Sequence, residues 1–427
     1  MSNFGYFVSR LGNHGMGRAL RHRDFSLYAT AGWVSNVGLW IHRTAVFWLT
    51  WEMTHSFSML GAMAFVDGIS TILVMPYAGT LSDRFNRLTL AKIVQLALIC
   101  ICSLTTLLSV TDMITIKVLF LLVILNGVAE GFWTPLRMTI PPSLVPKKDL
   151  PPALGVSATL FNLAQFIGPA LGGIIISSLS VTHAFAFNAV SYLAYLGVLF
   201  IIRFRYEEVI PHKPKGFITE FKEGLTYITK MPGLRGFLIL SLGVSVLMRA
   251  YRELFAGISD GIFNMGVEGL AILSSASGLG AMITAIYLGS FTKIPGLIKT
   301  IMFVLLISII TQLIFASTNL FWIAVTCAII LSGTATYAGI AGQLLIQNTI
   351  HGSVRGRVMS IWGVILRGGP AVGAWIIGAV AGYSNLQLAL TLATVAFISI
   401  WIWVLPRTKA MAKNLERSVE EREADIT

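Results

Sequence analysis

The chain contains about twelve apolar stretches, each near the ~20 residues that an α-helix needs to cross the hydrocarbon core of a membrane. Backbone polar groups in lipid must find partners within their own segment, so stretches of this kind fold as helices. Hydrophobic residues make up 55% of the 427 residues and charged residues 12%, which is more apolar than a soluble chain could bury. The sequence predicts an all-α integral membrane protein with twelve transmembrane helices. The stretches begin near Phe25, Phe57, Leu88, Val118, Leu154, Ala184, Leu234, Leu270, Ile298, Leu320, Ile361 and Leu386.

Basic residues fall in alternate loops between these stretches. They precede the first stretch, follow the second, fourth and tenth, and fill the long loop after the sixth. The positive-inside rule then places both termini and the long loop in the cytoplasm of a protein in the cell inner (plasma) membrane. The net charge of +12 therefore orients the chain, and we expect no nucleic acid partner. The first 24 residues contain no apolar run before a small-residue cleavage site, so we expect no removable signal peptide.

Two short patterns occur twice, a little over two hundred residues apart. Gly79-Thr-Leu-Ser-Asp-Arg follows the second stretch, and the related Gly289-Ser-Phe-Thr-Lys follows the eighth. Gly168-Pro-Ala-Leu-Gly-Gly in the fifth stretch is matched by Gly369-Pro-Ala-Val-Gly-Ala in the eleventh. These echoes predict a parallel duplication of six spans, an arrangement in which transporters bind substrate near the middle of the membrane.

The duplication predicts five segments. They are a cytoplasmic N-terminal segment (1–24), a six-helix bundle (25–202), a cytoplasmic linker (203–233), a second six-helix bundle (234–405) and a cytoplasmic tail (406–427). In the linker, apolar residues recur at helical spacing, which predicts an amphipathic helix on the membrane face; they are Phe217, Ile218, Phe221, Leu225 and Ile228.

With these patterns in view, the chain resembles the major facilitator superfamily of secondary transporters. Gly79-Thr-Leu-Ser-Asp-Arg-Phe-Asn-Arg87 is similar to the family loop motif between spans two and three, with Asn86 where the family usually has Gly. Asn36-Val-Gly, Pro135 to Pro146, Gly168 to Gly173 and Gln347 through Ser360 together look like the bacterial exporter branch that includes the enterobactin exporter. The resemblance covers nearly the whole chain and implies the major facilitator fold and alternating access.

The loop motif predicts a gate. We expect Asp83 at the start of the third span, where a helix N-terminus favours negative charge, flanked by Arg84 and Arg87. The resemblance implies that this aspartate bridges to the start of span eleven, beside Arg355 and Arg357, when the cytoplasmic side is closed. Helix capping together with positive-inside signalling is the alternative interpretation.

The glycine run in the fifth stretch has two interpretations. Gly168, Pro169, Gly172 and Gly173 resemble a motif that the family associates with antiporters, and we include them among the gating residues. The position four residues earlier is Ala164 rather than the usual Gly. Close packing of helices through small residues explains the run equally well.

Two acidic residues inside the stretches are candidate proton carriers. Glu130 lies deep in the fourth stretch, after Asn126, and its own helix offers no cationic neighbour. A carboxyl group in apolar surroundings favours the protonated form and can exchange a proton near neutral pH. Asp67 in the second stretch is the second candidate, although it could instead pair with Arg43 in the first, which would be a structural role.

Arginines in the first and seventh stretches predict the charge of the substrate. Arg249 and Glu253 are four residues apart and are expected to neutralise each other, which leaves Arg252 available. Arg43 and this pair occupy roughly matching places in the repeat, and two cationic positions suit carboxylate, catecholate or phosphate groups. An outer gate formed by Arg249, Arg252 and Glu253 is the alternative. The expected substrate-binding residues are Arg43, Arg249, Arg252, Glu253, Asn36, Trp40 and Asn126.

Several function classes remain. The first is a proton-coupled exporter of an amphipathic organic molecule, siderophore-like or drug-like; an uptake symporter or a lysophospholipid flippase would use the same fold. A non-transporting membrane receptor or scaffold is the alternative of another class, disfavoured because we see no added soluble domain. We expect no enzyme, since phosphate-binding and nucleophile motifs are missing from the sequence. No cofactor or metal is expected; the expected partners are a small-molecule substrate, protons and the lipid bilayer, and the expected state is a monomer.

Overall fold

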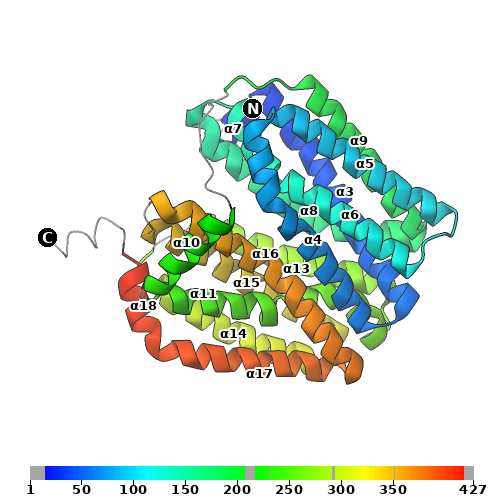
Figure 1. Ribbon diagram of the computed structural model, residues 1–427. Helices are drawn as coiled ribbons and strands as arrows, with labels where there is room; N and C mark the ends of the chain where they lie inside the picture. Colours follow the sequence, from blue (N-terminus) through cyan, green and yellow to red (C-terminus); the bar gives the residue numbers. More distant parts are fainter. Residues whose placement is uncertain (1–14, 207–216, 232, 291–293, 351, 418–427) are drawn as a thin grey trace, which may run out of the picture. The chain divides into compact units, whose positions relative to one another are not determined.

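A computed structural model describes residues 15–206, 217–231, 233–290, 294–350 and 352–417. Every regular element in these residues is a helix, and no strand occurs among them (Figure 1). The predicted all-α fold class is therefore confirmed. The chain forms two compact units, unit 1 with residues 1–49 and 70–213 and unit 2 with residues 50–69 and 214–427. The boundaries expected for the two six-helix bundles stay a prediction.

Unit 1 contains most of the helices of the first half. α3 ends and α4 begins within the short segment that belongs to unit 2. The helices are α2 (Gly15–Leu20), α3 (Arg23–Thr54), α4 (Phe57–Arg84), α5 (Arg87–Val110), α6 (Ile116–Thr139), α7 (Pro141–Leu144), the 3₁₀-helix η1 (Lys147–Asp149), α8 (Leu150–Ser178) and α9 (Val181–Ile201).

The helices of unit 2 follow a linker helix. They are α10 (Phe217–Lys230), α11 (Leu234–Gly243), η2 (Val244–Met248), η3 (Ala250–Leu254), α12 (Phe255–Gly257), η4 (Ile258–Ile262), α13 (Gly266–Ser290), α14 (Leu297–Ser317), α15 (Phe321–Thr349), α16 (Gly352–Tyr383), α17 (Leu386–Val404), η5 (Leu405–Arg407) and α18 (Thr408–Leu415).

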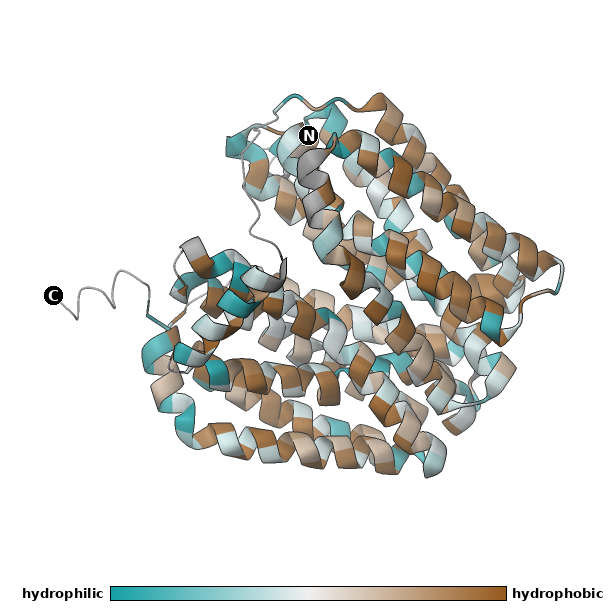
Figure 2. Ribbon diagram, viewed as in Figure 1, coloured by the Kyte–Doolittle hydropathy of each residue, from teal (hydrophilic) through white to brown (hydrophobic). Residues whose placement is uncertain are grey.

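Eleven spans in the described residues are long and apolar enough to cross a membrane. The first expected span corresponds to α3, which has 32 residues but is less apolar because it carries Asn36, His42 and Arg43. Figure 2 shows hydrophobic residues along α5 and α17, whereas hydrophilic residues gather on α10 and α18. Large apolar side chains such as Leu107 and Phe200 are exposed, as lipid-facing residues are. The protein is a multi-pass membrane protein.

One helix extends beyond its apolar stretch, and one expected placement is wrong. α16 begins at Gly352 rather than near Ile361, so Arg355 and Arg357 lie in its first turns. α4 continues to Arg84, so Asp83 lies in the last turn of α4 and not at the start of the third span. Helical hydrogen bonds continue past the end of an apolar stretch wherever charged residues can reach water, and hydropathy alone does not mark that point.

Short polar side chains mark where several helices begin. The Asn86 side chain accepts a hydrogen bond from the Thr89 amide (3.0 Å) at the start of α5. Thr115, Ser180 and Asn385 cap α6, α9 and α17 in the same way. Such caps satisfy amides that the first helical turn leaves unpaired. Capping of the third span therefore falls to Asn86 and not to Asp83.

In unit 1, the glycine run of α8 packs tightly against α3. A Cβ atom added at Gly168 would overlap the Cβ of Trp40, and one added at Gly172 would lie 3.3 Å from the Cα of Ile41. The missing side chains let the two helices approach closely. Close packing is thus one role of this run, and the antiport role stays a prediction.

In unit 2, the matching run of α16 makes the same kind of contact with span seven. A Cβ atom at Gly369 would overlap the side chain of Ser245, and one at Gly373 would overlap the carbonyl oxygen of Val246. Each unit therefore contains a crossing in which the glycines of a late helix meet a helix from the start of the same half of the chain.

The linker helix α10 lies against the first turns of α16. The Glu223 carboxylate and the Arg357 guanidinium form an ion pair of 2.7 Å between Oε2 and Nη1. A Cβ atom at Gly224 would lie 3.2 Å from the Arg357 Cβ, so the two helices are close at this point. Ile228 is buried on the same side, whereas Leu225 is 49% exposed.

The residue after α18, Glu416, binds the start of α14 in unit 2. The Glu416 carboxylate accepts hydrogen bonds from the Gly296 amide (2.7 Å) and the Ile298 amide (2.8 Å) at the start of α14. A carboxylate at this position satisfies unpaired amides and complements the helix dipole. Met411 and Leu415 of α18 are buried in the core of unit 2.

We expect Gly373→Ala to lower the thermal midpoint of the purified protein in detergent, at a cost of about 1–3 kcal/mol, because the new Cβ must displace span seven. Gly363→Ala is the matched control on the same helix, since nothing lies within 4 Å of its added Cβ. Alanine there should leave the midpoint unchanged or raise it through better helix propensity. Equal midpoints for the two variants would contradict the tight crossing.

Candidate functional site

Span seven is a broken helix in unit 2. Its α-helical start, α11, passes into a π-helical turn (η2), a 3₁₀ segment (η3), a short α-helical turn (α12) and a second π-helical turn (η4). π-helical turns concentrate at functional sites because they shift side chains out of the regular helical order. The sequence predicted one continuous helical span here, with Arg249, Arg252 and Glu253 inside it, because the pattern of apolar residues contains no sign of the break.

Arg249 lies at the junction of η2 and η3, followed by Arg252 and Glu253 in η3. All three side chains are half-buried. Within the described residues Arg249 forms neither an ion pair nor a hydrogen bond, although the Glu253 charge acts on it electrostatically, so the predicted pairing of the two stays a prediction. The 3₁₀ segment has about three residues per turn, so residues four apart no longer share a face.

A pocket lies beside Arg249, entirely within unit 2. The pocket is narrow and partly open to its surroundings. Its walls come from α11, η2, α14, α15 and α16, and its polar residues are Ser241, Ser245, Arg249 and Trp362. The remaining lining residues are apolar, among them Phe237 and Leu305.

Unit 1 contains a second cationic site, the arginine–aromatic row, formed by Arg43, Trp40, Phe161 and Arg137. The Arg43 guanidinium carbon lies 5.9 Å from the Trp40 ring centre, and the Arg137 guanidinium carbon lies 4.7 Å from that of Phe161. The two rings meet edge to face with centroids 6.4 Å apart. Asn36 accepts a hydrogen bond of 3.2 Å from the Arg137 guanidinium. The row offers two cations around two aromatic faces, an arrangement that suits anionic or aromatic ligands.

Arg137 was missed by the sequence analysis. Pro135 was taken to lie after span four, but α6 continues through it to Thr139. Prolines are tolerated inside membrane helices when neighbouring groups satisfy the freed backbone. Arg137 lies seven residues after Glu130, about two turns along the same face of α6, and this spacing is a signal that could have revealed it.

Glu130 lies in a buried polar network of unit 1. The Tyr192 hydroxyl donates a hydrogen bond to its Oε1 atom (3.2 Å). Around this pair, the Gln95 amide donates to the Tyr192 carbonyl (3.2 Å) and the Asn188 amide contacts the Cys102 sulfur (3.3 Å). The network joins α6 to α5 and α9, and of its members only Glu130 is predicted from the sequence. One turn earlier, Asn126 is also buried.

The other predicted site residues are placed as follows. Asp67 is a half-buried residue of α4 in unit 2, and Arg43 belongs to unit 1, so their pairing stays a prediction. Arg355 donates hydrogen bonds to the Ile350 carbonyl (3.4 and 3.2 Å), and Arg357 pairs with Glu223. The gate between Asp83 and the start of α16 also stays a prediction. The remaining gating residues lie at the end of α4 (Gly79, Arg84), the start of α5 (Arg87) and in α8 (Gly168, Pro169, Gly172, Gly173).

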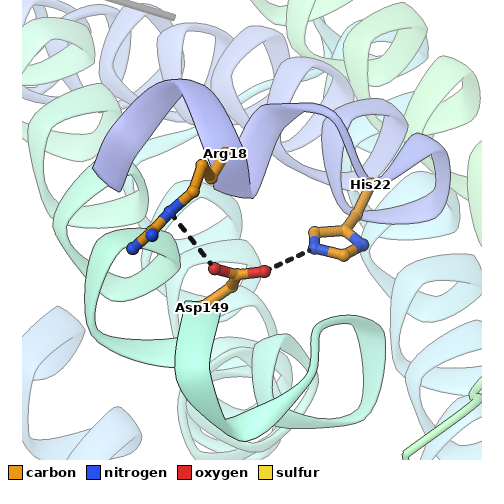
Figure 3. A network of polar contacts seen from close by, with 3 residues as sticks. All are labelled: Arg18, His22 and Asp149. Carbon is orange, nitrogen blue, oxygen red and sulfur yellow. Dashed lines mark hydrogen bonds and ion pairs between the residues drawn. The ribbon is translucent and has the colours of Figure 1, made fainter. Parts of the chain in front are cut away.

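A polar cluster at the start of unit 1 holds the N-terminal helix. The Asp149 carboxylate lies 2.9 Å from His22 Nε2 and 3.5 Å from Arg18 Nε (Figure 3). Asp149 is only 5% exposed, whereas Arg18 is 55% exposed. The cluster ties α2 to η1, and Arg205 ties the segment after α9 to Asp24 (3.1 Å). Arg18 and Arg205 therefore have structural roles in addition to the predicted role of basic residues in orienting the chain in the membrane.

Metal ligation has no candidate in the described part of the chain, where no three His, Cys, Asp or Glu side chains come together. The sites of both units are therefore built from arginines, aromatic rings, hydroxyls and one buried carboxyl group.

The comparisons with known proteins agree with this architecture. The enterobactin exporter EntS of Salmonella typhimurium is 24% identical over 370 residues, covering 84% of this chain and 85% of the relative. The staphyloferrin A transporter of Staphylococcus aureus is 22% identical over 339 residues, covering 76% and 81%. A crystal structure of a peptide transporter POT superposes with a TM-score of 0.73 at 12% identity, covering 92% of this chain and 95% of that one, which shows the shared fold.

The sequence pattern of one family covers nearly the whole chain. It is described as transmembrane secretion effector and matches residues 18–425. The fold, the internal glycine echoes and the related exporters point the same way. The chain therefore belongs to the transmembrane secretion effector family, a branch of the major facilitator superfamily of membrane transporters.

Proposed function

We propose that this transporter exports an amphipathic organic molecule, siderophore-like or drug-like, by proton-coupled alternating access. The observation that carries the proposal is the buried Glu130 carboxyl group in contact with the Tyr192 hydroxyl. The name of the related enterobactin exporter supports the direction of transport, and the names enterobactin exporter and staphyloferrin A transporter together support the kind of substrate. A panel of such molecules in proteoliposomes with an imposed pH gradient tests the proposal directly.

Proton coupling requires a group that gains and loses a proton during the cycle. Glu130 is 9% exposed and is surrounded by α5, α6 and α9. A buried carboxyl group changes its charge at a pH set by its surroundings, and a hydroxyl neighbour can donate to the charged form. A helix movement that changes the contact between Tyr192 and Glu130, or the access of water to Glu130, would then change the proton affinity of the Glu130 carboxyl group. Asp67 remains the second proposed carrier.

The arginine–aromatic row supports an anionic, partly aromatic substrate. Arg43 and Arg137 supply positive charge, and Trp40 and Phe161 supply ring surface. Arg forms paired hydrogen bonds with carboxylate, catecholate and phosphate groups. In unit 2, Arg249 is the corresponding cation at the pocket.

The topology proposed with this function places both termini in the cytoplasm of an inner-membrane protein. Basic residues in alternate loops support that orientation. The linker with α10, the tail with α18 and the cluster around Asp149 would then all lie on the cytoplasmic side. We further propose that the working unit is a monomer with its two six-helix bundles at 25–202 and 234–405.

Glu130→Gln should abolish accumulation driven by a pH gradient and leave substrate exchange measurable. The glutamine keeps the shape and can still accept the hydrogen bond from Tyr192, but it no longer binds a proton. Uptake into inverted proteoliposomes, with and without the gradient, measures both activities. Glu52→Gln makes the same chemical change at an exposed carboxyl group and should behave like the unmodified protein. Unchanged gradient-driven transport in Glu130→Gln would transfer the role to Asp67 or exclude coupling through Glu130.

Asp83→Asn should slow transport and leave the protein folded and inserted, because the proposed bridge to the start of α16 loses its charge. A helix C-terminus disfavours negative charge, so an aspartate in the last turn of α4 gains nothing from the dipole of its own helix. Transport rate and thermal midpoint are measured on the same preparation.

Asn86→Ala is the control for Asp83→Asn. It removes the cap of α5, at a cost of about 1 kcal/mol in stability, and should leave the transport rate near normal. Wild-type transport in Asp83→Asn, or an equal loss of rate in Asn86→Ala, would contradict the gate.

Arg137→Gln should weaken binding of an acidic substrate about ten- to hundredfold, since a charge-assisted contact typically contributes about 1.5–3 kcal/mol. A neutral analogue should bind as before. Lys92→Gln is the matched control, because Lys92 also lies over an aromatic ring of unit 1, that of Phe200 at 4.4 Å, but outside the row. Equal weakening of acidic and neutral ligands would reduce Arg137 to a packing role.

A further inference from the structure

The pocket of unit 2 has a donor-rich polar lining. Its polar side chains are one guanidinium, one indole N–H and two hydroxyls, from Arg249, Trp362, Ser245 and Ser241. None of its lining residues is an aspartate, glutamate, asparagine or glutamine. A ligand in this pocket therefore meets positive charge and donors.

Three of these polar groups have no partner in the described part of the chain. Ser245 Oγ and Trp362 Nε1 are buried and form no hydrogen bond there. Arg249 likewise has neither a hydrogen bond nor an ion pair there. By contrast, the Ser241 hydroxyl already donates to the Phe237 carbonyl (2.8 Å). Buried polar groups are almost always satisfied in folded proteins, so the two buried donors of Ser245 and Trp362, beside the half-buried Arg249, indicate a missing acceptor.

Ser241, Ser245 and Arg249 follow one another at intervals of four residues, so they share one face of span seven. Ser245 lies in the π-helical turn η2, and Arg249 follows its last residue. Gly369 of α16 leaves no room beside Ser245, which fixes that part of the backbone. Trp362 of α16 stacks on the Phe237 ring, with the ring centroids 5.9 Å apart and an interplanar angle of 15°. The indole N–H is thereby held in a defined orientation.

We propose that this pocket binds the oxyanion end of an amphipathic acid, a carboxylate or phosphate group on a slender apolar chain. The oxyanion accepts from Ser245 and Trp362 and pairs with Arg249, while the chain lies against apolar residues such as Leu305 and Leu366. The assignment rests on the proposed function where the ligand is the transported substrate. A membrane lipid with an anionic headgroup has the same chemistry and is the other source.

The probe is labelled octanoate, titrated against the full-length protein in phosphatidylcholine nanodiscs, with empty nanodiscs as the blank. We expect saturable binding that octylammonium does not displace and octanol displaces only weakly. Arg249→Gln should weaken octanoate about ten- to hundredfold, because it removes the charge-assisted contact. Ser245→Ala and Trp362→Phe should each weaken it severalfold; the phenylalanine keeps the stacking ring and removes only the donor.

Ser241→Ala is the matched control, since this hydroxyl lines the same pocket with its donor already used, and it should change the affinity less than twofold. Should Arg249→Gln fail to fold, Ser245→Ala and Trp362→Phe decide the matter. Unchanged octanoate affinity in both, at a normal thermal midpoint, overturns the proposal. Equal displacement by octanol also overturns it, because the pocket would then recognise only the chain.

Nanodiscs containing phosphatidylglycerol distinguish the two sources. If phosphatidylglycerol weakens octanoate binding to the unmodified protein but not to Trp362→Phe, relative to phosphatidylcholine alone, the pocket is assigned to a lipid headgroup. If octanoate binds equally well in both kinds of nanodisc, the pocket is assigned to the substrate. Gradient-driven transport is measured in parallel. Octanoate binding without any transport supports the pocket and counts against the proposed function, whereas transport that persists when octanoate does not bind overturns the pocket alone.

Discussion

Two glycine crossings position the candidate site residues of this transporter. In a membrane, helices gain nothing from hiding apolar surface from lipid, so close packing through small residues has to hold them together. Gly168 of α8 lies against Trp40, a member of the arginine–aromatic row, and Gly369 of α16 lies against Ser245, a wall of the unit 2 pocket. The contacts that hold each unit together therefore also set the geometry of its site.

The break in span seven depends on this packing. An irregular backbone is tolerated at membrane depth only where protein or a wet cavity covers it, because lipid offers no hydrogen-bond partners. α16 covers the π-helical turn η2, with Gly373 directly on the carbonyl of Val246. The covered irregular turn contains Ser245 and ends just before Arg249, and both residues line the same pocket.

The two units use polar groups in different ways. In unit 1, the buried Glu130 carboxyl group is satisfied by Tyr192, within a network that joins three helices. In unit 2, the Ser245 hydroxyl and the Trp362 indole N–H line the pocket and form no hydrogen bond within the described residues. The proposed coupling of a proton to an organic anion would use both kinds of site, the carboxyl group for the proton and the donors for the anion.

The class of fold and the residues with unusual chemistry could be predicted from the sequence. About twelve apolar stretches near membrane length allow only helices, and the repeated Gly-Pro runs predicted the tight crossings. Glu130, Arg43 and Arg249 stood out because charge inside an apolar stretch is costly. Each of these signals is local, a matter of composition or spacing along one segment.

Partners and exact helix ends were decided only by tertiary structure. Tyr192 lies 62 residues from Glu130, and no spacing rule links them. Arg137 was hidden behind Pro135 because neighbouring helices, and not the proline itself, decide whether a membrane helix continues. The 3₁₀ segment that follows Arg249 and contains Glu253 likewise could not be predicted from the pattern of residues in span seven. Such features follow from packing against other helices, which the order of residues along one helix does not contain.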